Sequence, residues 1–244
     1  MKFSEINKVF FLGIGGIGMS AIARFFLNSG KIVYGYDLTS SVLTKTLEDE
    51  GAIIHYQDDE NNIPENLDLV IYTPAIPSTN KEYHYLNNSN IPMLKRSQAL
   101  GIICEDFFTI AIAGTHGKTT TSSMVAHLLQ NAGKNVTAFI GGIMSNYSTN
   151  FITAKNTEII VVEADEFDRS FLALYPDCAT ITSVDSDHLD IYGNQNNLIS
   201  TFRQFASQIK PNGRLFIKPD LSLTINNVKV DKYGLINSRP LGFI

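Results

Sequence analysis

Short apolar runs and longer amphipathic segments alternate along the first hundred residues. The apolar runs predict buried strands over residues 9–12, 32–36, 52–55, 68–73 and 91–94. Apolar positions repeat at helical spacing from Ile17 to Asn28, and residues 39–41 are able to cap a second helix that ends at Gly51. Strands that alternate with helices at this spacing predict a parallel sheet that is covered on both faces.

The same pattern starts again at Phe107, where a second series of apolar runs begins. These runs predict strands over residues 107–112, 136–140, 158–162, 178–183 and 213–217. A helix that passes through Met124 and Leu128 is predicted after the first of them. The stretch 145–156 is polar and is predicted to be a loop.

The two series indicate two domains, over residues 1–100 and 101–244, with the boundary between Arg96 and Asp106. Because no strand–helix repeat is predicted after Val230, we expect the second sheet to be unfinished. On this pattern the fold class is α/β, with two parallel-sheet domains in tandem.

Composition and charge exclude several classes of protein. With 44% hydrophobic residues, the 244-residue chain is able to bury a large core, so it is not disordered as a whole. Its net charge of −5 gives no overall basic field for nucleic acid. No apolar run approaches the roughly 20 residues that cross a bilayer, and no signal-peptide core is present. Cys104 and Cys178 are expected to be buried, reduced thiols, and the protein is expected to be cytoplasmic, without a nucleic-acid or membrane partner.

A glycine-rich loop with the spacing GxGxxG follows the first strand. Such a loop lets the backbone approach a pyrophosphate, while the following helix directs its free N–H groups at the same anion. Asp37 ends the next strand, where an acidic group accepts hydrogen bonds from a ribose. The predicted contacts are Gly15, Gly16, Ile17, Gly18 and Asp37, joined by Thr73 and Ala75 after a later strand. The alternatives are that the glycines only close-pack the helix on the strand and that residues 73–75 form a plain turn.

A second glycine loop, which follows the strand over residues 107–112, gives the stronger signal. Its predicted nucleotide contacts are Gly114, Thr115, His116, Gly117, Lys118, Thr119 and Thr120. In a phosphate-binding loop of this type, main-chain amides hold the phosphates, the lysine bridges the terminal ones and the threonine hydroxyl ligates Mg²⁺. The loop departs from the full GxxxxGK[ST] pattern, since Ile112 stands in place of the first glycine. A purely structural Lys118 is disfavoured, because a buried ammonium at a helix start opposes the helix dipole unless an anion compensates it.

Acidic residues and one histidine follow two later strands. Glu163 comes directly after a wholly apolar strand, so it is predicted to hold Mg²⁺ opposite Lys118. Glu166, in the acidic cluster that follows, is interpreted as part of a solvated loop. His188 lies in an acid-rich turn after the strand over residues 178–183 and is a candidate second metal ligand. The predicted catalytic set is therefore Lys118, Glu163 and His188, and the predicted metal ligands are Thr119, Glu163 and His188.

Four segments together resemble the signature stretches of the Mur ligases. They are residues 13–20 (GIGGIGMS), 114–121 (GTHGKTTT), 163–172 (EADEFDRSFL) and 187–193 (DHLDIYG). The resemblance implies a Rossmann-like domain that binds the UDP part of UDP-N-acetylmuramate, followed by a P-loop ATPase-type domain that binds ATP and Mg²⁺. It also implies that ATP phosphorylates the muramate carboxylate and that L-alanine then displaces the phosphate. Phe167 stands where many members of the family carry a small residue.

The resemblance implies a third domain that binds the amino acid, which the 244 residues do not include. We therefore expect a fragment that binds uridine nucleotide, binds MgATP weakly and ligates little alone. Alternatives within the same chemistry are a ligase that reattaches a recycled tripeptide to the same sugar nucleotide and a folate-polyglutamating ligase, which lacks the first domain. Outside it, the alternatives are a nicotinamide-dependent dehydrogenase that uses Gly13–Gly18 and Asp37, and a nucleotide-binding module without catalysis.

Overall fold

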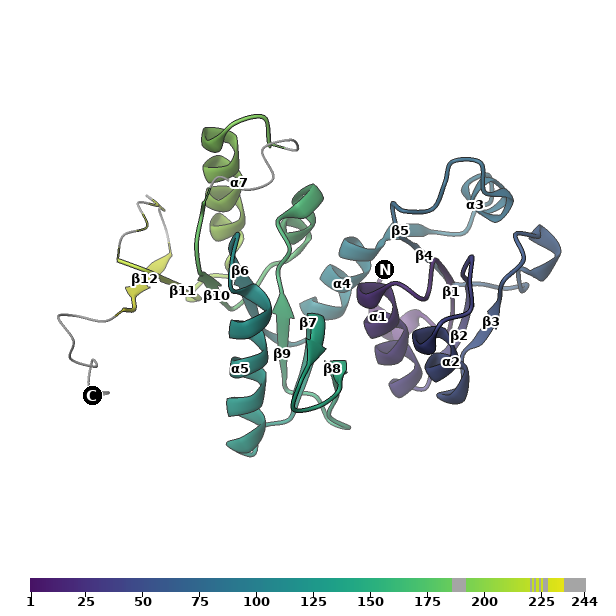
Figure 1. The fold of residues 1–244 in the computed structure, drawn as a ribbon, viewed down its shortest axis with the longest axis horizontal. Helices are drawn as coiled ribbons and strands as arrows, with labels where there is room; N and C mark the ends of the chain where they lie inside the picture. Colours follow the sequence, from purple (N-terminus) through teal and green to yellow (C-terminus); the bar gives the residue numbers. More distant parts are fainter. Residues whose placement is uncertain (186–191, 220, 222, 224, 226–227, 235–244) are drawn as a thin grey trace.

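Two parallel sheets lie side by side in the computed structural model, which describes residues 1–185, 192–219, 221, 223, 225 and 228–234 (Figure 1). The first sheet has the strand order β3-β2-β1-β4-β5 and the second β12-β11-β10-β6-β9-β7-β8. Every pairing is parallel except that of β7 with β8. The α/β fold with two parallel sheets in tandem is thus confirmed.

The first sheet and its helices occupy the amino-terminal part of the chain. The elements are η1 (Phe3–Glu5), β1 (Lys8–Leu12), α1 (Ile17–Asn28), β2 (Ile32–Tyr36), α2 (Val42–Asp49), β3 (Ile53–His55), η2 (Glu60–Asn62), β4 (Leu69–Tyr72), α3 (Lys81–Asn87) and β5 (Met93–Lys95). The hydroxyl of Ser41 caps α2 by accepting a hydrogen bond from the Thr44 N–H, as the predicted cap requires. The strand order reverses on either side of β1, so the glycine loop after β1 lies beside the end of β4, at a topological switch point.

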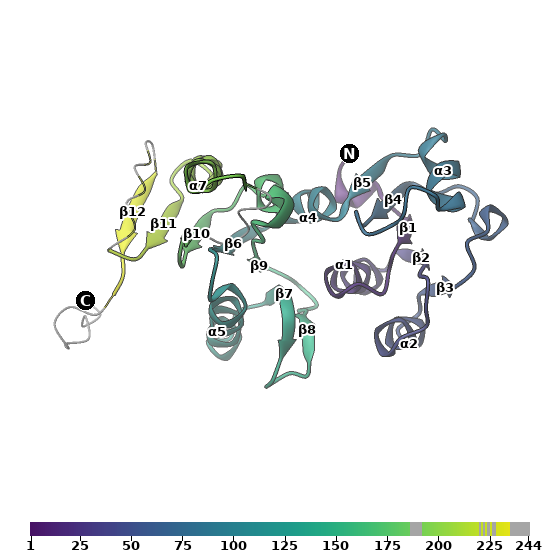
Figure 2. The ribbon, with the colours of Figure 1, turned by 45° about the horizontal axis from the view of Figure 1, so that its top comes forward.

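The second sheet follows a helix that connects the two halves. The elements are α4 (Arg96–Glu105), β6 (Phe108–Ala113), α5 (Lys118–Asn131), β7 (Val136–Met144), β8 (Thr149–Ile152), β9 (Ile159–Glu163), η3 (Phe167–Ala173), β10 (Cys178–Ile181), α7 (Gln195–Ser207), β11 (Arg214–Ile217) and β12 (Lys229–Lys232). The strand β6 lies between β10 and β9, so the second glycine loop also lies where the strand order reverses. The expected boundary region is the helix α4, which lies between the sheets (Figure 2).

One predicted loop is wrong. Residues 149–152 form β8, which pairs antiparallel with β7 and buries Phe151 and Ile152. Asn150, the polar residue next to Phe151, is fully buried. The strand tolerates this burial because the Asn150 side chain donates to the Ile17 carbonyl oxygen at 2.7 Å. Its amide oxygen also accepts from Arg24. The strand was therefore hidden by a polar side chain whose hydrogen bonds lie on α1, far away in the sequence.

The carboxy-terminal edge of the second sheet also differs from expectation. The strand β12 pairs in parallel with β11, although the sequence pattern predicted no strand there. Three of its four residues are charged (KVDK), which is typical of an edge strand, because charged side chains protect an open sheet edge. The same charges hide the strand pattern in the sequence. The helices α3, α4 and α7 were likewise not predicted.

A continuous apolar cluster joins the two halves. The Phe25 ring on α1 lies 6.2 Å from that of Phe107 and 5.7 Å from that of Phe139, centroid to centroid. Cys104 belongs to this cluster, and burial raises the pKa of its thiol to about 12. Both cysteines are free, and Cys178 is half-buried. Among the described residues, no helix has the length and apolar character that crossing a membrane requires. The packing of α1 against the second sheet fixes the two glycine loops relative to each other.

Candidate nucleotide-binding sites

The first glycine loop is tied to the end of the neighbouring strand. The Gly15 N–H donates to Asp37 Oδ2 at 2.7 Å. A cavity of about 470 Å³ opens at this edge of the sheet. Its walls include Gly13, Gly16, Asp37, Thr73 and Ala75, so most of the predicted uridine-nucleotide contacts lie together. Ile17 and Gly18 begin α1 just beyond it.

Close packing also requires glycine in this loop. A Cβ on Gly15 would lie 2.8 Å from Thr44 Cγ2 and 2.9 Å from Asp37 Oδ2. A Cβ on Gly18 would lie 2.6 Å from an Arg96 guanidinium nitrogen. The packing explanation for these glycines therefore holds. It does not conflict with the ligand explanation, which stays a prediction, because the absence of a side chain serves both. Tyr36 also lines the cavity, and its pKa is raised, mainly by burial.

The second glycine loop turns into α5 through a left-handed residue. Gly117 is the N-cap residue of α5 with a φ of 81°, a conformation that glycine adopts without steric cost. The loop main chain is fastened to the end of β10: the Ser183 hydroxyl accepts from the His116 N–H at 2.9 Å and bonds the Thr115 hydroxyl at 2.9 Å. The Thr182 hydroxyl donates to the His116 carbonyl oxygen. Sequence reasoning missed Thr182 and Ser183, although polar residues at the end of an apolar strand are a readable signal.

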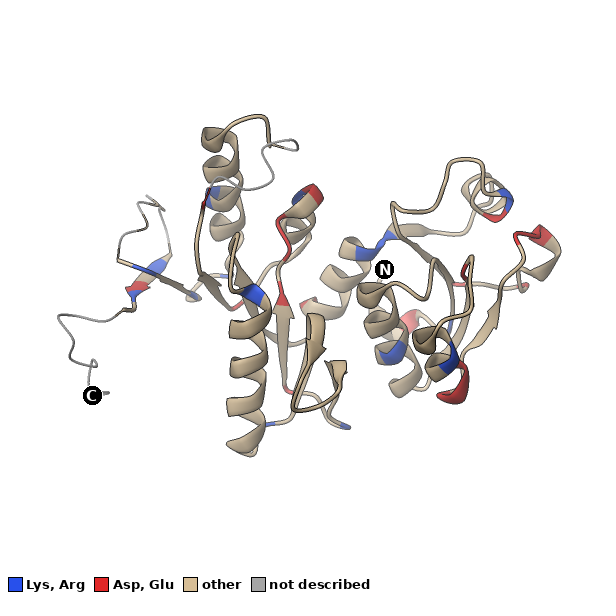
Figure 3. Cartoon of the chain, viewed as in Figure 1, with Lys and Arg blue, Asp and Glu red and all other residues tan. Residues whose placement is uncertain are grey.

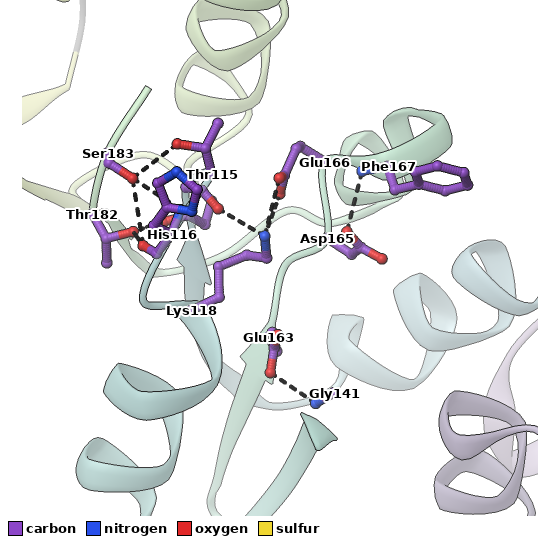
Figure 4. A network of polar contacts seen from close by, with 12 residues as sticks. Thr115, His116, Lys118, Gly141, Glu163, Asp165, Glu166, Phe167, Thr182 and Ser183 are labelled. Carbon is purple, nitrogen blue, oxygen red and sulfur yellow. Dashed lines mark hydrogen bonds and ion pairs between the residues drawn. The ribbon is translucent and has the colours of Figure 1, made fainter. Parts of the chain in front are cut away.

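Lys118 has a buried carboxylate as its partner. Its ammonium lies 2.8 Å from Glu166 Oε2 and 3.0 Å from Oε1, and it donates to the Gly114 carbonyl oxygen at 2.8 Å (Figure 4). The Glu166 side chain is 0% exposed and that of Lys118 is 14% exposed. Glu166 is therefore not in a solvated loop, and that interpretation was wrong. The anion that a buried lysine at a helix start requires is supplied within the protein.

The backbone that carries Glu166 is held from the other side. The Tyr192 hydroxyl donates to the Glu166 carbonyl oxygen at 2.5 Å, and burial raises the pKa of Tyr192 to about 12. Two consecutive residues of the following turn, Asp168 and Arg169, have φ values of 51° and 55°. Two non-glycine residues in the left-handed region are uncommon and are typical of functional loops.

Thr119 and Glu163 meet at the carboxyl end of β9. The Thr119 hydroxyl donates to Glu163 Oε1 at 2.8 Å, and the Gly141 N–H donates to Oε2 at 2.7 Å. Gly141 lies in β7, where a Cβ would approach the Glu163 carboxylate within 3.0 Å. A hydroxyl and a carboxylate oxygen are ligands that Mg²⁺ accepts, so these two residues fit a shared magnesium ion. In the part of the chain that the structure describes, no group of three or more His, Cys, Asp or Glu side chains has metal-site geometry.

The remaining predicted residues lie around this centre. His116 is exposed, with its Nε2 3.8 Å from the exposed Asp185. Thr120 shares a cavity of about 330 Å³ with Thr119, between α5 and residues 143–147. His188, the predicted third catalytic residue and metal ligand, lies outside the described residues. Lys118, Thr119 and Glu163 are thus brought together at one sheet edge, as the sequence indicated, while their roles stay predictions.

Two further cavities lie between the loops. One of about 440 Å³ shares Thr73 and Ala75 with the first cavity and reaches Arg96 and Phe167. Another of about 60 Å³ is lined by residues that include Gly18, Arg96 and Glu163. A series of cavities thus leads from the first glycine loop to the carboxylate beside the second. Two glycine loops that are connected by cavities are an arrangement that suits a protein with two nucleotide sites, which stays a prediction here.

Comparisons with known proteins agree with this arrangement. Residues 8–108 match the family described as "Mur ligase family, catalytic domain", and residues 112–238 match "Mur ligase middle domain". The chain belongs to the Mur ligase family, which confirms the resemblance seen in the motifs. Members of this family are ATP-dependent ligases.

Individual relatives within the family are similar to this chain at higher identity. The chain is 51% identical to the UDP-N-acetylmuramate–L-alanine ligase of Flavobacterium johnsoniae over 91% of its own length and 50% of the relative. It is 45% identical to the enzyme of the same name in Christiangramia forsetii, over 93% of the chain and 52% of the relative. The chain thus spans about half the length of the curated relatives it matches.

Solved structures support the fold. The UDP-N-acetylmuramate-alanine ligase of Thermotoga maritima superposes with a TM-score of 0.77 at 32% identity, over 89% of this chain and 50% of that one. A ligase of Neisseria meningitides named for UDP-N-acetylmuramate and L-alanyl-gamma-D-glutamyl-meso-diaminopimelate has a TM-score of 0.84. It is 23% identical over 94% of this chain and 78% of that one, so it supports the fold alone.

Proposed function

We propose that the chain provides the sugar-nucleotide and MgATP sites of a ligase that joins L-alanine to the carboxylate of UDP-N-acetylmuramate. The first glycine loop and Asp37 bind the uridine nucleotide, and the loop that contains Lys118 binds ATP. The observation that carries the proposal is the series of cavities from Gly18 past Arg96 to Glu163, which connects the two loops. The names of the relatives, at 45–51% identity, support the choice of substrates.

The proposed reaction has two steps. A carboxylate oxygen of the sugar attacks the γ-phosphorus of ATP, the bond to the β-phosphate oxygen breaks, and ADP leaves. The amine of alanine then attacks the carbonyl carbon of the acyl phosphate, inorganic phosphate leaves, and the nitrogen loses a proton. The first step brings two anions together, so it needs positive charge that is fixed in place before the reaction.

The residues of the second loop supply what that step needs. The Lys118 ammonium lies at the start of α5, where it is able to neutralise charge on the transferred phosphoryl group. The Thr119 hydroxyl and the Glu163 carboxylate would hold Mg²⁺, which supplies further neutralisation of the phosphate oxygens when it is bound. The Gly141 N–H keeps Glu163 turned toward Thr119. Because the reaction consumes ATP, we also propose that it takes place in the cytoplasm.

Calorimetry on the 244-residue chain tests the sugar-nucleotide site directly. We expect UDP-N-acetylmuramate and UDP to bind and NADH not to bind, since a dehydrogenase would use the same loop for a nicotinamide dinucleotide. Binding of NADH in place of UDP would contradict the proposal. We expect the 244-residue chain to form little ligation product alone. Product that contains L-alanyl-γ-D-glutamyl-meso-diaminopimelate in preference to L-alanine would indicate the tripeptide-recycling reaction instead.

A further inference from the structure

The first glycine loop lacks a positive side chain of its own. Residues 13–18 include neither lysine nor arginine. The cavity beside the loop is lined by Asp37 and Asp58 and by no cation among its described residues. A sugar nucleotide that binds there brings a diphosphate with two negative charges next to these carboxylates. The helix dipole of α1 offsets only about half a unit charge, so the site needs a cation from elsewhere.

Arg96 is the cation that the fold brings to this loop. It is the first residue of α4, and its guanidinium packs directly against Gly18 in the first turn of α1. The basic segment at the junction of β5 and α4 lies beside the start of α1 (Figure 3). Glycine at position 18 is what permits this approach, because a Cβ there would lie 2.6 Å from the Arg96 Nη1 atom.

The Arg96 guanidinium is available to a ligand. Within the described part of the chain, no hydrogen bond or ion pair of this side chain is found, and it is half-buried. It lines both connecting cavities, together with Asp168 in one and with Glu163 and Asp165 in the other. Burying part of a guanidinium without a partner costs free energy, which an anion in these cavities would recover.

We propose that Arg96 binds the diphosphate of the uridine-nucleotide sugar, a role that rests on the proposed function. The planar guanidinium forms paired hydrogen bonds with phosphate oxygens, and the free N–H groups at the start of α1 bind the same group from the other side. Since Arg96 also lines the cavity that reaches Glu163, the bound diphosphate directs the sugar toward the ATP site.

Binding measurements on Arg96→Gln and Arg96→Lys test this role. By calorimetry, we expect Arg96→Gln to weaken UDP binding by about 10- to 100-fold, the loss typical of a charge-assisted hydrogen bond. Arg96→Lys should keep part of the affinity, because it keeps the charge but not the paired geometry. Binding of MgADP at the second loop should be unchanged in both variants, which also reports that the chain is folded.

Lys134→Gln is the control. Lys134 is an exposed lysine that follows α5, and it lines none of the cavities described above. We expect its UDP affinity to equal that of the unmodified chain. Equal losses in Lys134→Gln and Arg96→Gln, or no loss in Arg96→Gln, would overturn the role of Arg96 while UDP still binds. Failure of the unmodified chain to bind UDP would overturn the proposed function itself.

Discussion

The two glycine loops share one strand–loop–helix pattern, but the protein balances charge around them in opposite ways. In the first loop the Gly15 N–H donates a hydrogen bond to the Asp37 carboxylate. The cation beside this loop, Arg96, comes from another helix, α4. The second loop contains its own cation, Lys118, and the loop after β9 supplies the buried Glu166 as its partner. On the proposed function, two loops of the same strand–loop–helix pattern serve two kinds of anion, and the side chains around each loop determine which.

This difference indicates what each site is built to hold. A diphosphate is recognised largely by main-chain N–H groups and shape, so its loop needs few charged residues of its own. A reacting triphosphate gathers more charge, which fits a loop that carries a lysine and lies beside the proposed metal-binding pair, Thr119 and Glu163. Variants that act on one loop and leave the other unchanged sharpen this comparison.

The largest effect is expected at the buried ion pair. Lys118→Met leaves Glu166 buried without the ammonium, and we expect a loss of about 3 kcal/mol in the free energy of unfolding. The double variant Lys118→Met, Glu166→Gln should recover much of this loss, because neither member of the pair is then charged. Denaturant unfolding of the single and double variants measures the coupling. Additive losses would show that the pair does not stabilise the second loop.

An intermediate effect is expected at the proposed metal-binding pair. Glu163→Gln keeps the size of the side chain but removes the charge, so we expect the magnesium-dependent part of ADP affinity to fall by at least about tenfold. Glu158→Gln, an exposed residue just before the start of β9 at the opposite sheet edge, is the control and should leave that affinity unchanged. Calorimetry with ADP, in the presence and absence of Mg²⁺, measures the magnesium-dependent part of the affinity for each variant. Equal magnesium dependence in Glu163→Gln and the unmodified chain would contradict the metal role.

A smaller effect is expected at Asp37. Asp37→Ala removes the acceptor for the Gly15 N–H, so we expect UDP affinity to fall about fivefold while MgADP affinity is unchanged. Asp68→Ala is the matched control, since Asp68 also accepts main-chain N–H bonds, from Asn7 and Lys8, but at the opposite end of β1. It should affect stability and not UDP binding. A loss of UDP affinity in the control as large as that in Asp37→Ala would remove the argument for a local role.

The smallest effect concerns pH. The main-chain N–H groups of Lys8 and Asn7 hold the pKa of Asp68 below its ordinary value. Its contribution to stability is therefore present above the ordinary pKa and is lost as the pH falls through the lowered one. Acidification should destabilise Asp68→Ala less than the unmodified chain, as measured by unfolding at neutral and acidic pH. An equal loss in both would contradict this assignment.

Much of the fold was readable from sequence because buried parallel strands are continuous apolar runs. The runs at residues 32–36 and 9–12 coincide with β2 and with most of β1. The strand β8 was missed because Asn150 interrupts its apolar pattern and finds its hydrogen-bond partners on α1. The strand β12 was missed because charged residues dominate an edge. In both cases tertiary contacts or exposure decide the residue types, and local pattern does not report them.

The candidate site was also predictable only in part from the sequence. The residues that follow apolar strands, Asp37 and Glu163, lie at sheet edges beside the loops that the motifs indicated. Glu166 was misjudged because an acidic residue within an acidic segment gives no sign of burial, and its lysine partner lies 48 positions away. From sequence, Arg96 was open between a phosphate contact across the domain boundary and a surface ion pair, since its packing against Gly18 depends on how α4 meets α1.

The central claim is that the two loops hold two different ligands at the same time. Titration of UDP-N-acetylmuramate into the 244-residue chain that is already saturated with MgADP tests it most directly. The account predicts that the sugar nucleotide binds one equivalent without displacing ADP. It also predicts that Lys118→Met, Glu166→Gln loses ADP binding and keeps that of the sugar nucleotide. Competition between the two ligands for one site, or loss of both in that variant while it remains folded, would contradict the account.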